Sequence, residues 1–175
     1  MNTRRLIRIS LFTLLTIIGG YIHIPVGYIC FTFQTLFVMM SGLFLGAKDG
    51  AISQIAYLLL GLIGLPVFAH GGGFSYVFQP SFGYLIGFVF GATMAGALAK
   101  NQSKKLLLWL DLVVSLLVIY IIGVAYQTII LLFVNGLAPQ AVAISLLTVV
   151  VMFVVDCFLL YLVTLVYKKL KKIIN

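Results

Sequence analysis

Hydrophobic residues occupy six long stretches of the chain, and each stretch is bounded by charged residues, glycine or proline. The stretches run over residues 6–24, 31–46, 51–64, 81–99, 106–134 and 141–167. A helix needs about 20 mostly apolar residues to cross a membrane. The pattern therefore predicts six transmembrane helices, with a short second and third helix and a long fifth and sixth. Apolar and polar residues do not alternate with a period of two, which argues against a transmembrane β-barrel.

The composition excludes the other broad classes of protein. Hydrophobic residues make up 63% of the 175 positions and charged residues only 8%, whereas soluble domains are about 45–50% apolar and about 25% charged. Such a chain cannot cover a globule with polar surface, and it is too apolar to be intrinsically disordered. We therefore expect an all-α integral membrane protein, with residues 1–175 forming one six-helix membrane domain.

The positive charges indicate how the predicted helices are oriented. Eleven Lys and Arg residues against three Asp residues give a net charge of +8. In a six-helix topology all of these cations fall on the same side of the membrane: Arg4, Arg5, Arg8, Lys48, Lys100, Lys104, Lys105, Lys168, Lys169, Lys171 and Lys172. Cytoplasmic loops are enriched in Lys and Arg, so both termini are predicted to be cytoplasmic. The charge excess thus indicates topology rather than a nucleic-acid partner.

The loops on the predicted outer side contain no Lys, Arg, Asp or Glu. They hold all four prolines and the long loop 65–80, in which His70 is followed by Gly71–Gly73. Successive glycines let a backbone approach another group closely. We interpret this loop as a cover over an outward-facing pocket, and an ordinary connector is the alternative.

Asp156 is the acidic residue with an unusual position. It lies twelve residues before Lys168, which is about 18 Å along a helix and places it in the outer half of a membrane core about 30 Å thick. A carboxylate there costs several kcal/mol unless it faces a polar cavity. We predict a ligand contact, and an acid that only joins helices is the alternative. Asp49, next to Lys48 in a tight turn, is interpreted as a solvated turn residue.

Small residues recur at every fourth position of the fourth stretch, at Gly83, Gly87, Gly91, Ala95 and Ala99. Such a stripe lets helix backbones approach closely in a membrane. We predict that it packs against another helix of this chain, and contact with a second subunit is the alternative.

The usual catalytic motifs are missing from the sequence. It contains no Glu, no HExxH, GxSxG or CxxC motif, and no nucleotide-binding P-loop. We therefore expect a binding protein rather than an enzyme, with no metal or cofactor. Aromatic residues near the outer face form either an interfacial belt or the wall of a pocket for a ring-containing solute: Phe31, Phe33, Phe68, Phe74, Tyr76, Phe78, Phe82 and Tyr84.

Residues 25–88 carry a series of motifs that resemble one known family. The motifs are Gln34-Thr35-Leu36, Gly42 with Leu45-Gly46, Tyr57, the run Gly-Leu-Ile-Gly-Leu-Pro-Val-Phe-Ala at 61–69, the triple glycine Gly71–Gly73, and Pro80, Gly83-Tyr84-Leu85 and Gly87-Phe88. Together they resemble the BioY family, the biotin-specific S-components of energy-coupling factor (ECF) transporters. The fifth and sixth stretches match through Asp156 alone.

The resemblance implies a function and a set of site residues. It implies high-affinity capture of biotin from outside a prokaryotic cell by a plasma-membrane protein. A transmembrane coupling protein and two cytoplasmic ATPases would supply the energy. Asp156 would accept hydrogen bonds from the ureido ring, since a carboxylate accepts two N–H bonds well. Gly72, Gly73, Gln79 and Tyr84 would shape the site, and Phe68 and Phe74 would form apolar walls.

The sequence also departs from the family pattern near the predicted site. The family usually has Lys three residues after the acid, where Leu159 stands here, and Gly before the proline, where Gln79 stands. The ligand carboxylate would then be held by backbone N–H groups of Gly71–Gly73, by Gln79 or by protonated His70. Two alternatives remain open: an S-component for another small vitamin or biotin-like precursor, and a structural membrane protein without a ligand.

Overall fold

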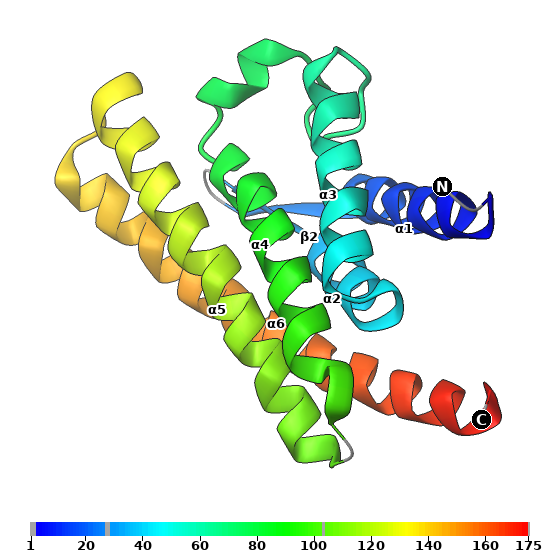
Figure 1. Cartoon of the computed structure of the whole chain (residues 1–175). Helices are drawn as coiled ribbons and strands as arrows, with labels where there is room; N and C mark the ends of the chain where they lie inside the picture. The colour runs from blue at the N-terminus through cyan, green and yellow to red at the C-terminus, as the bar shows by residue number, and fades with distance from the viewer. Residues whose placement is uncertain (1–2, 27–28, 103, 175) are drawn as a thin grey trace.

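The computed structural model describes the backbone of residues 3–26, 29–102 and 104–174 and the side chains of 3–25, 31–100, 102 and 104–169. Within these residues the chain forms α-helices α1 (Thr3–Tyr21), α2 (Gln34–Leu45), α3 (Ala47–Leu62), α4 (Phe82–Leu98), α5 (Lys105–Ile129) and α6 (Pro139–Ile174) (Figure 1). Short helical turns η1 (Phe74–Phe78) and η2 (Ala99–Asn101) flank α4, and the π-helical turn η3 (Ile130–Val134) continues α5. Each of the six predicted hydrophobic stretches thus overlaps with one α-helix.

The expectation of an all-α fold is wrong for the segment between α1 and α2. Strands β1 (His23–Val26) and β2 (Ile29–Thr32) form an antiparallel hairpin in which His23 pairs with Thr32. Pro25 has no backbone N–H and cannot continue a helix, and β-branched residues on both sides of it favour extended backbone. The predicted second helical stretch, 31–46, therefore begins as a strand and becomes helical only at Gln34.

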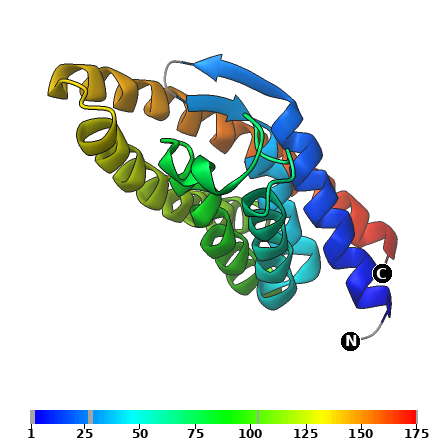
Figure 2. The same cartoon turned by 90° about the horizontal axis from the view of Figure 1, so that it is seen from above.

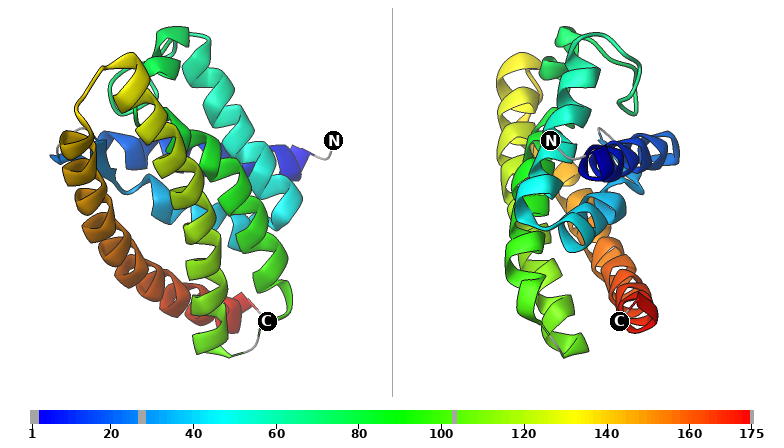
Figure 3. Two further views of the ribbon diagram at one scale, coloured as in Figure 1. Left: turned by 90° about the vertical axis from the view of Figure 1, so that its left-hand side faces the viewer. Right: turned by 45° about the vertical axis from the view of Figure 1, so that its right-hand side comes forward.

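Part of the helical bundle forms a layer that another helix crosses. Helices α3, α4 and α5 lie side by side, and α1 crosses behind α3 (Figure 1). The curved helix α6 runs back along α5 from the η3 turn (Figure 3), and the hairpin lies over the N-terminal half of α6 when the molecule is seen from above (Figure 2). Among the described residues, the segments Lys105–Val134 and Pro139–Lys169 are long and apolar enough to cross a membrane.

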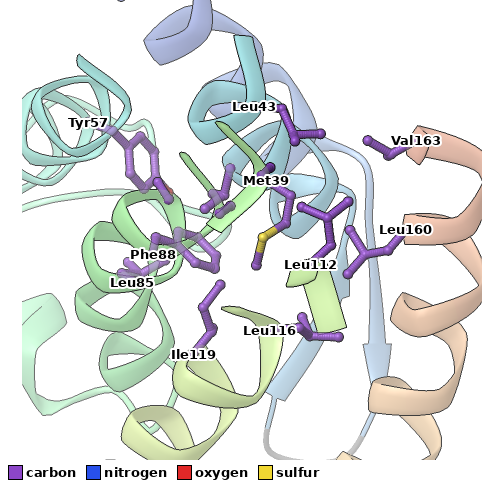
Figure 4. Close-up of a cluster of buried hydrophobic side chains, with 14 of the residues drawn as sticks. Met39, Leu43, Tyr57, Leu85, Phe88, Leu112, Leu116, Ile119, Leu160 and Val163 are labelled. Atoms are coloured by element: carbon purple, nitrogen blue, oxygen red, sulfur yellow. The ribbon is translucent and has the colours of Figure 1, made fainter. Parts of the chain in front are cut away.

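The core lies where α2, α4, α5 and α6 meet (Figure 4). Met39 of α2 is completely buried and faces Leu112 and Leu116 of α5, while Leu160 of α6 closes the cluster. Burying an aliphatic side chain of this size stabilises a water-soluble fold by about 1.5–3 kcal/mol. In lipid, close van der Waals packing takes over this role. The cluster packs α6 against α2 and α5.

Close helix packing explains the stripe of small residues in α4. A Cβ atom added at Gly87 would lie 2.9 Å from the Cα of Ile119 on α5, and one added at Gly42 of α2 would lie 2.9 Å from the Cβ of Ala95. The stripe therefore packs inside this chain, on α5 at its first half and on α2 at its second, as predicted.

The interpretation of Asp49 as a solvated turn residue is wrong. Arg5 Nε donates to Asp49 Oδ2 over 2.8 Å and Arg5 Nη2 donates to Oδ1 over 2.5 Å, which ties the start of α1 to the start of α3. This guanidinium lowers the pKa of the Asp49 carboxyl below its usual value. Arg5, Lys48, Lys100 and Tyr167 line one open groove beside this ion pair. The side chains of Lys171 and Lys172 lie outside the described residues.

Candidate ligand-binding site

A pocket opens at the end of the molecule that carries the hairpin and the 65–73 loop. It encloses about 630 Å³ of empty space, including the open space at its mouth. Its walls come from β2, the 65–73 loop, η1 and helices α2, α4, α5 and α6. The lining residues are Phe31, Thr32, Gln34, Thr35, Ala69, His70, Tyr76, Ser81, Tyr84, Leu85, Phe88, Ile119, Tyr120, Met152 and Asp156. The pocket is therefore mostly aromatic and apolar with a few convergent polar groups, which is typical of small-molecule sites.

Asp156 of α6 provides the carboxylate of the pocket. Only 3% of this residue is exposed. Tyr120 of α5 donates a hydrogen bond to Asp156 Oδ2 over 2.9 Å, and the Thr35 side chain of α2 interacts with the same carboxylate from another wall of the pocket. Side chains from two other helices thus hold the Asp156 carboxylate in place. A carboxylate has about four acceptor sites, so some remain for a ligand.

Aromatic rings stand beside this carboxylate. The ring of Tyr120 makes edge contacts with Tyr84, at 5.7 Å between centroids, and with Phe153, at 5.2 Å. The Tyr84 hydroxyl donates to Gln127 Oε1 over 2.8 Å, and Gln127 Nε2 donates to Ser145 Oγ over 3.3 Å. These bonds join α4, α5 and α6 on one side of the pocket and fix the orientation of the Tyr84 ring.

Gln34 is another polar residue of the pocket wall. It begins α2, is 3% exposed, and donates from Nε2 to the Tyr57 hydroxyl over 2.5 Å. Its Oε1 accepts a hydrogen bond from the Thr32 hydroxyl over 3.3 Å. The Gln34 side chain therefore connects the hairpin to α3 and is held rigid at the pocket wall.

The 65–73 loop presents two residues to the pocket at the tip of a tight turn. Phe68 N donates to Gly71 O over 2.8 Å and Gly71 N donates to Phe68 O over 3.1 Å, so Ala69 and His70 form the tip. Gly71 has φ +110°, a value that favours glycine. The loop is anchored on α3, because Gly73 N donates to Gly61 O over 2.7 Å.

The seven predicted site residues occupy three different environments. Tyr84 and Asp156 line the pocket together. Phe68 is 1% exposed and packs beneath the loop between Tyr57 and Tyr76. The remaining four do not line the pocket in the described structure: Gly72 and Gly73 lie against the end of α3, Gln79 is exposed, and Phe74 is 72% exposed. The binding roles assigned to all seven remain predictions.

Tyr120 is a pocket residue that the sequence analysis missed. It lies 36 positions before Asp156, so no local spacing connects the two residues. A usable signal was present, because Tyr120 is one of the few side chains with a polar group in a mostly apolar segment, where polar groups usually find a partner. Thr35 was noted only as part of a motif, although it also contacts the carboxylate.

Comparison with known proteins identifies the family. The family model of BioY matches residues 1–175. A probable biotin transporter BioY of Lysinibacillus sphaericus is 41% identical over 128 residues, which cover 71% of this chain and 65% of that relative. The biotin transporter BioY of Thermotoga maritima is 41% identical over 122 residues, covering 69% of this chain and 72% of that protein.

Solved structures show the same fold. The crystal structure of an S-component for biotin from an ECF-type ABC transporter is 27% identical, with a TM-score of 0.82 over 98% of this chain and 95% of that one. The S-component of a bacterial ECF transporter, 18% identical, has a TM-score of 0.71 over 100% of this chain and 99% of that one, and so shares the fold. The chain belongs to the BioY family.

Proposed function

We propose that this protein is the substrate-binding S-component of an ECF-type vitamin importer and that it captures biotin from outside the cell. The match of the whole chain to the BioY family and the similarity to an S-component for biotin support this proposal. The observation that carries it is the pocket around Asp156, which combines a buried carboxylate with aromatic walls. The role is binding and transport, not catalysis.

The chemistry of the pocket fits the ring system of biotin. The ureido ring has two N–H groups, and a carboxylate can accept both in a charge-assisted pair. Tyr120 and Thr35 hold the Asp156 carboxylate for this contact. The rings of Tyr84 and Phe88 offer apolar surface to the rest of the bicyclic ring. We assign Asp156 and Tyr84 as ligand contacts on this basis, and Phe68 as the anchor beneath the loop that covers them.

The proposed arrangement in the membrane is a single domain of six transmembrane helices with both termini in the cytoplasm of a prokaryotic cell. The groove lined by Arg5, Lys48 and Lys100 supports this arrangement, because it brings together the start of α1, the α2–α3 turn and the end of α4. Such clustered cations are expected on the cytoplasmic side. The pocket around Asp156 then faces outward.

The energy for transport would come from partner proteins. The 175 residues of the sequence contain no P-loop motif for binding ATP. The proposed partners are a transmembrane coupling protein and two cytoplasmic ATPases, which would use ATP to deliver the bound vitamin to the cytoplasm.

Calorimetric titration of the purified protein with biotin tests the proposal. We expect heat of binding at micromolar biotin, and a tenfold to hundredfold weaker affinity in Asp156→Asn, because charge-assisted hydrogen bonds contribute about 1.5–3 kcal/mol. Asp111→Asn is the matched control, since Asp111 lies on α5 outside the pocket lining. A folded protein that gives no heat with biotin but co-purifies with another vitamin would be an S-component for that vitamin. Unchanged binding in Asp156→Asn would make the acid architectural.

A further inference from the structure

One face of α5 carries three residues that build a wall of the pocket. Tyr120, Gly123 and Gln127 follow one another at spacings of three and four, which place them on the same side of the helix. Tyr120 donates to the Asp156 carboxylate. A Cβ atom added at Gly123 would lie 2.4 Å from Cδ1 of Tyr84, so the Tyr84 ring packs directly on the backbone of α5. Gln127, one turn further along, binds the hydroxyl of the same ring.

The hydrogen bonds beyond Tyr84 have a defined direction. Ser145 Oγ donates to the carbonyl oxygen of Val142 over 2.7 Å, and a carbonyl can only accept. The Ser145 oxygen therefore accepts from Gln127 Nε2, over 3.3 Å. This contact turns Gln127 Oε1 toward Tyr84, whose hydroxyl donates to it over 2.8 Å. Gln127 is completely buried, so its amide is held in this orientation away from solvent.

The hydroxyl protons of Tyr84 and Tyr120 are thus both used inside the protein. Tyr120 donates to Asp156, and Tyr84 donates to Gln127. A tyrosine hydroxyl has a single proton to donate, while its oxygen keeps acceptor capacity. The pocket residues Tyr84, Tyr120 and Asp156 therefore offer acceptors to a ligand. Such a wall suits ligand N–H groups and disfavours a ligand oxygen at the same place.

We propose that Gln127 is a positioning residue that makes this wall specific for N–H groups. By accepting the Tyr84 proton, Gln127 leaves the Tyr84 oxygen as an acceptor beside Asp156. Gln127 does not line the pocket in the described structure, so it acts through Tyr84. The inference rests on the proposed function and names the ligand chemistry that the wall selects, a ring with N–H donors such as the ureido ring of biotin. A ring of the same shape with an oxygen in place of N–H would leave an acceptor of the wall unpaired, which weakens binding.

The test compares biotin with two cyclic carbamates of the same shape, in each of which an oxygen replaces one of the two ureido N–H groups. Calorimetric titration gives the ratio of the affinities for biotin and for each carbamate. We expect the wild-type protein to prefer biotin over both by about hundredfold, because each carbamate lacks a donor that the wall requires. In Gln127→Met the Tyr84 proton can turn to the ligand, so the preference over the carbamate whose oxygen faces Tyr84 should fall to about tenfold. The preference over the carbamate whose oxygen faces Asp156 should stay at the wild-type value.

A second variant shows whether Gln127 acts through Tyr84. Tyr84→Phe keeps the ring and removes the hydroxyl, so it should lower the preference over the same carbamate. Adding Gln127→Met to Tyr84→Phe should then change this preference no further. Gln102→Met makes the same chemical change at the turn after α4, outside the pocket lining, and should leave both preferences at their wild-type values. Thermal unfolding in detergent establishes that the compared variants are folded.

The outcomes separate this inference from the proposed function. If folded Gln127→Met keeps both preferences, or loses affinity equally for all three ligands, the role of Gln127 is overturned while biotin binding by the wild-type protein still stands. If Gln127→Met does not fold, Tyr84→Phe decides alone, and an unchanged preference in that variant would overturn the inference. Absence of biotin binding in the folded wild-type protein would overturn the proposed function itself.

Discussion

Tyr120 on α5 donates a hydrogen bond to the carboxylate of Asp156 on α6 over 2.9 Å, inside the pocket. The Tyr120 ring is itself held between Tyr84 of α4 and Phe153 of α6. The bond therefore orients the acid and also joins two long helices at the level of the pocket. Its removal should affect both binding and the packing of α6.

The first prediction concerns the hydroxyl of this tyrosine. Tyr120→Phe keeps the ring and removes the donor, so the carboxylate loses one of its two described partners. We expect about tenfold weaker biotin binding by calorimetry, because hydrogen bonds to a charged group contribute about 1.5–3 kcal/mol. Tyr161→Phe is the control, since Tyr161 lies on the same helix as Asp156 but is 48% exposed. Unchanged affinity in Tyr120→Phe would mean that the acid is positioned without it.

The second prediction separates two phenylalanines of the same loop region. Phe68 fills a notch against Gly61 and contacts Tyr57 and Tyr76, while Phe74 is 72% exposed. Phe68→Ala should destabilise the protein by about 3–5 kcal/mol, the usual cost of removing a buried phenylalanine, and should weaken biotin binding by loosening the turn that carries His70. Phe74→Ala should change stability by less than about 1 kcal/mol.

Thermal unfolding in detergent and calorimetric titration measure these two effects. A loss of binding in Phe74→Ala at unchanged stability would contradict the structure and restore Phe74 as a ligand wall. If Phe68→Ala proves too unstable to titrate, Phe68→Leu keeps most of the buried volume and allows the binding measurement.

The sequence predicts the helical framework well, because long apolar stretches have few alternatives. The fourth stretch, 81–99, nearly coincides with α4, and its small-residue stripe packs inside the chain as expected. The hairpin was missed because 31–33 are as apolar as the helix that follows them. There Pro25 and the β-branched residues around it determine the local structure, not hydrophobicity.

The site is predictable only in part, for a different physical reason. Asp156 could be identified because a lone carboxylate in an apolar segment needs a polar cavity. The hydrogen-bond partners of Asp156 and Asp49 could not be identified from the sequence. Tyr120 lies 36 positions from Asp156, and Arg5 lies 44 positions from Asp49. Such pairs depend on how helices cross, which a one-dimensional pattern does not contain. The exposure of the Phe74 side chain likewise depends on tertiary structure, because the preceding loop turns back onto α3 through Gly73.

The third prediction tests the close contact between α2 and α4. Gly42→Ala adds one methyl group in a helix, which by intrinsic propensity alone should stabilise it by about 1 kcal/mol. Here the added Cβ would overlap the carbonyl oxygen of Ala92, which is backbone and cannot move aside alone. We expect destabilisation by about 1–3 kcal/mol instead, measured by thermal unfolding in detergent. Ala97→Val on the exposed face of α4 is the control and should have little effect. A more stable Gly42→Ala variant would contradict the packing.

The last prediction concerns the pH dependence of the Arg5–Asp49 ion pair. The pKa of Asp49 is lowered in the folded protein, chiefly by the hydrogen bonds from Arg5. A carboxyl with a lowered folded-state pKa stabilises the fold above its unfolded-state pKa, near 3.9 for Asp, and this contribution is lost as the pH falls through the folded-state value. Asp49→Asn should therefore lower the unfolding temperature at pH 7, and the difference from wild type should shrink as the pH falls below about 4.

A double-mutant cycle separates the pair from other effects of either substitution. Arg5→Gln should lower the unfolding temperature at pH 7, and adding Asp49→Asn to it should have little further effect, because the partner is already gone. The side chains are 36% and 21% exposed, so added salt should also narrow the difference from wild type at pH 7. Additive losses at pH 7, or a difference that stays constant between pH 7 and pH 3, would mean that the two helices are joined at this end by packing rather than by charge.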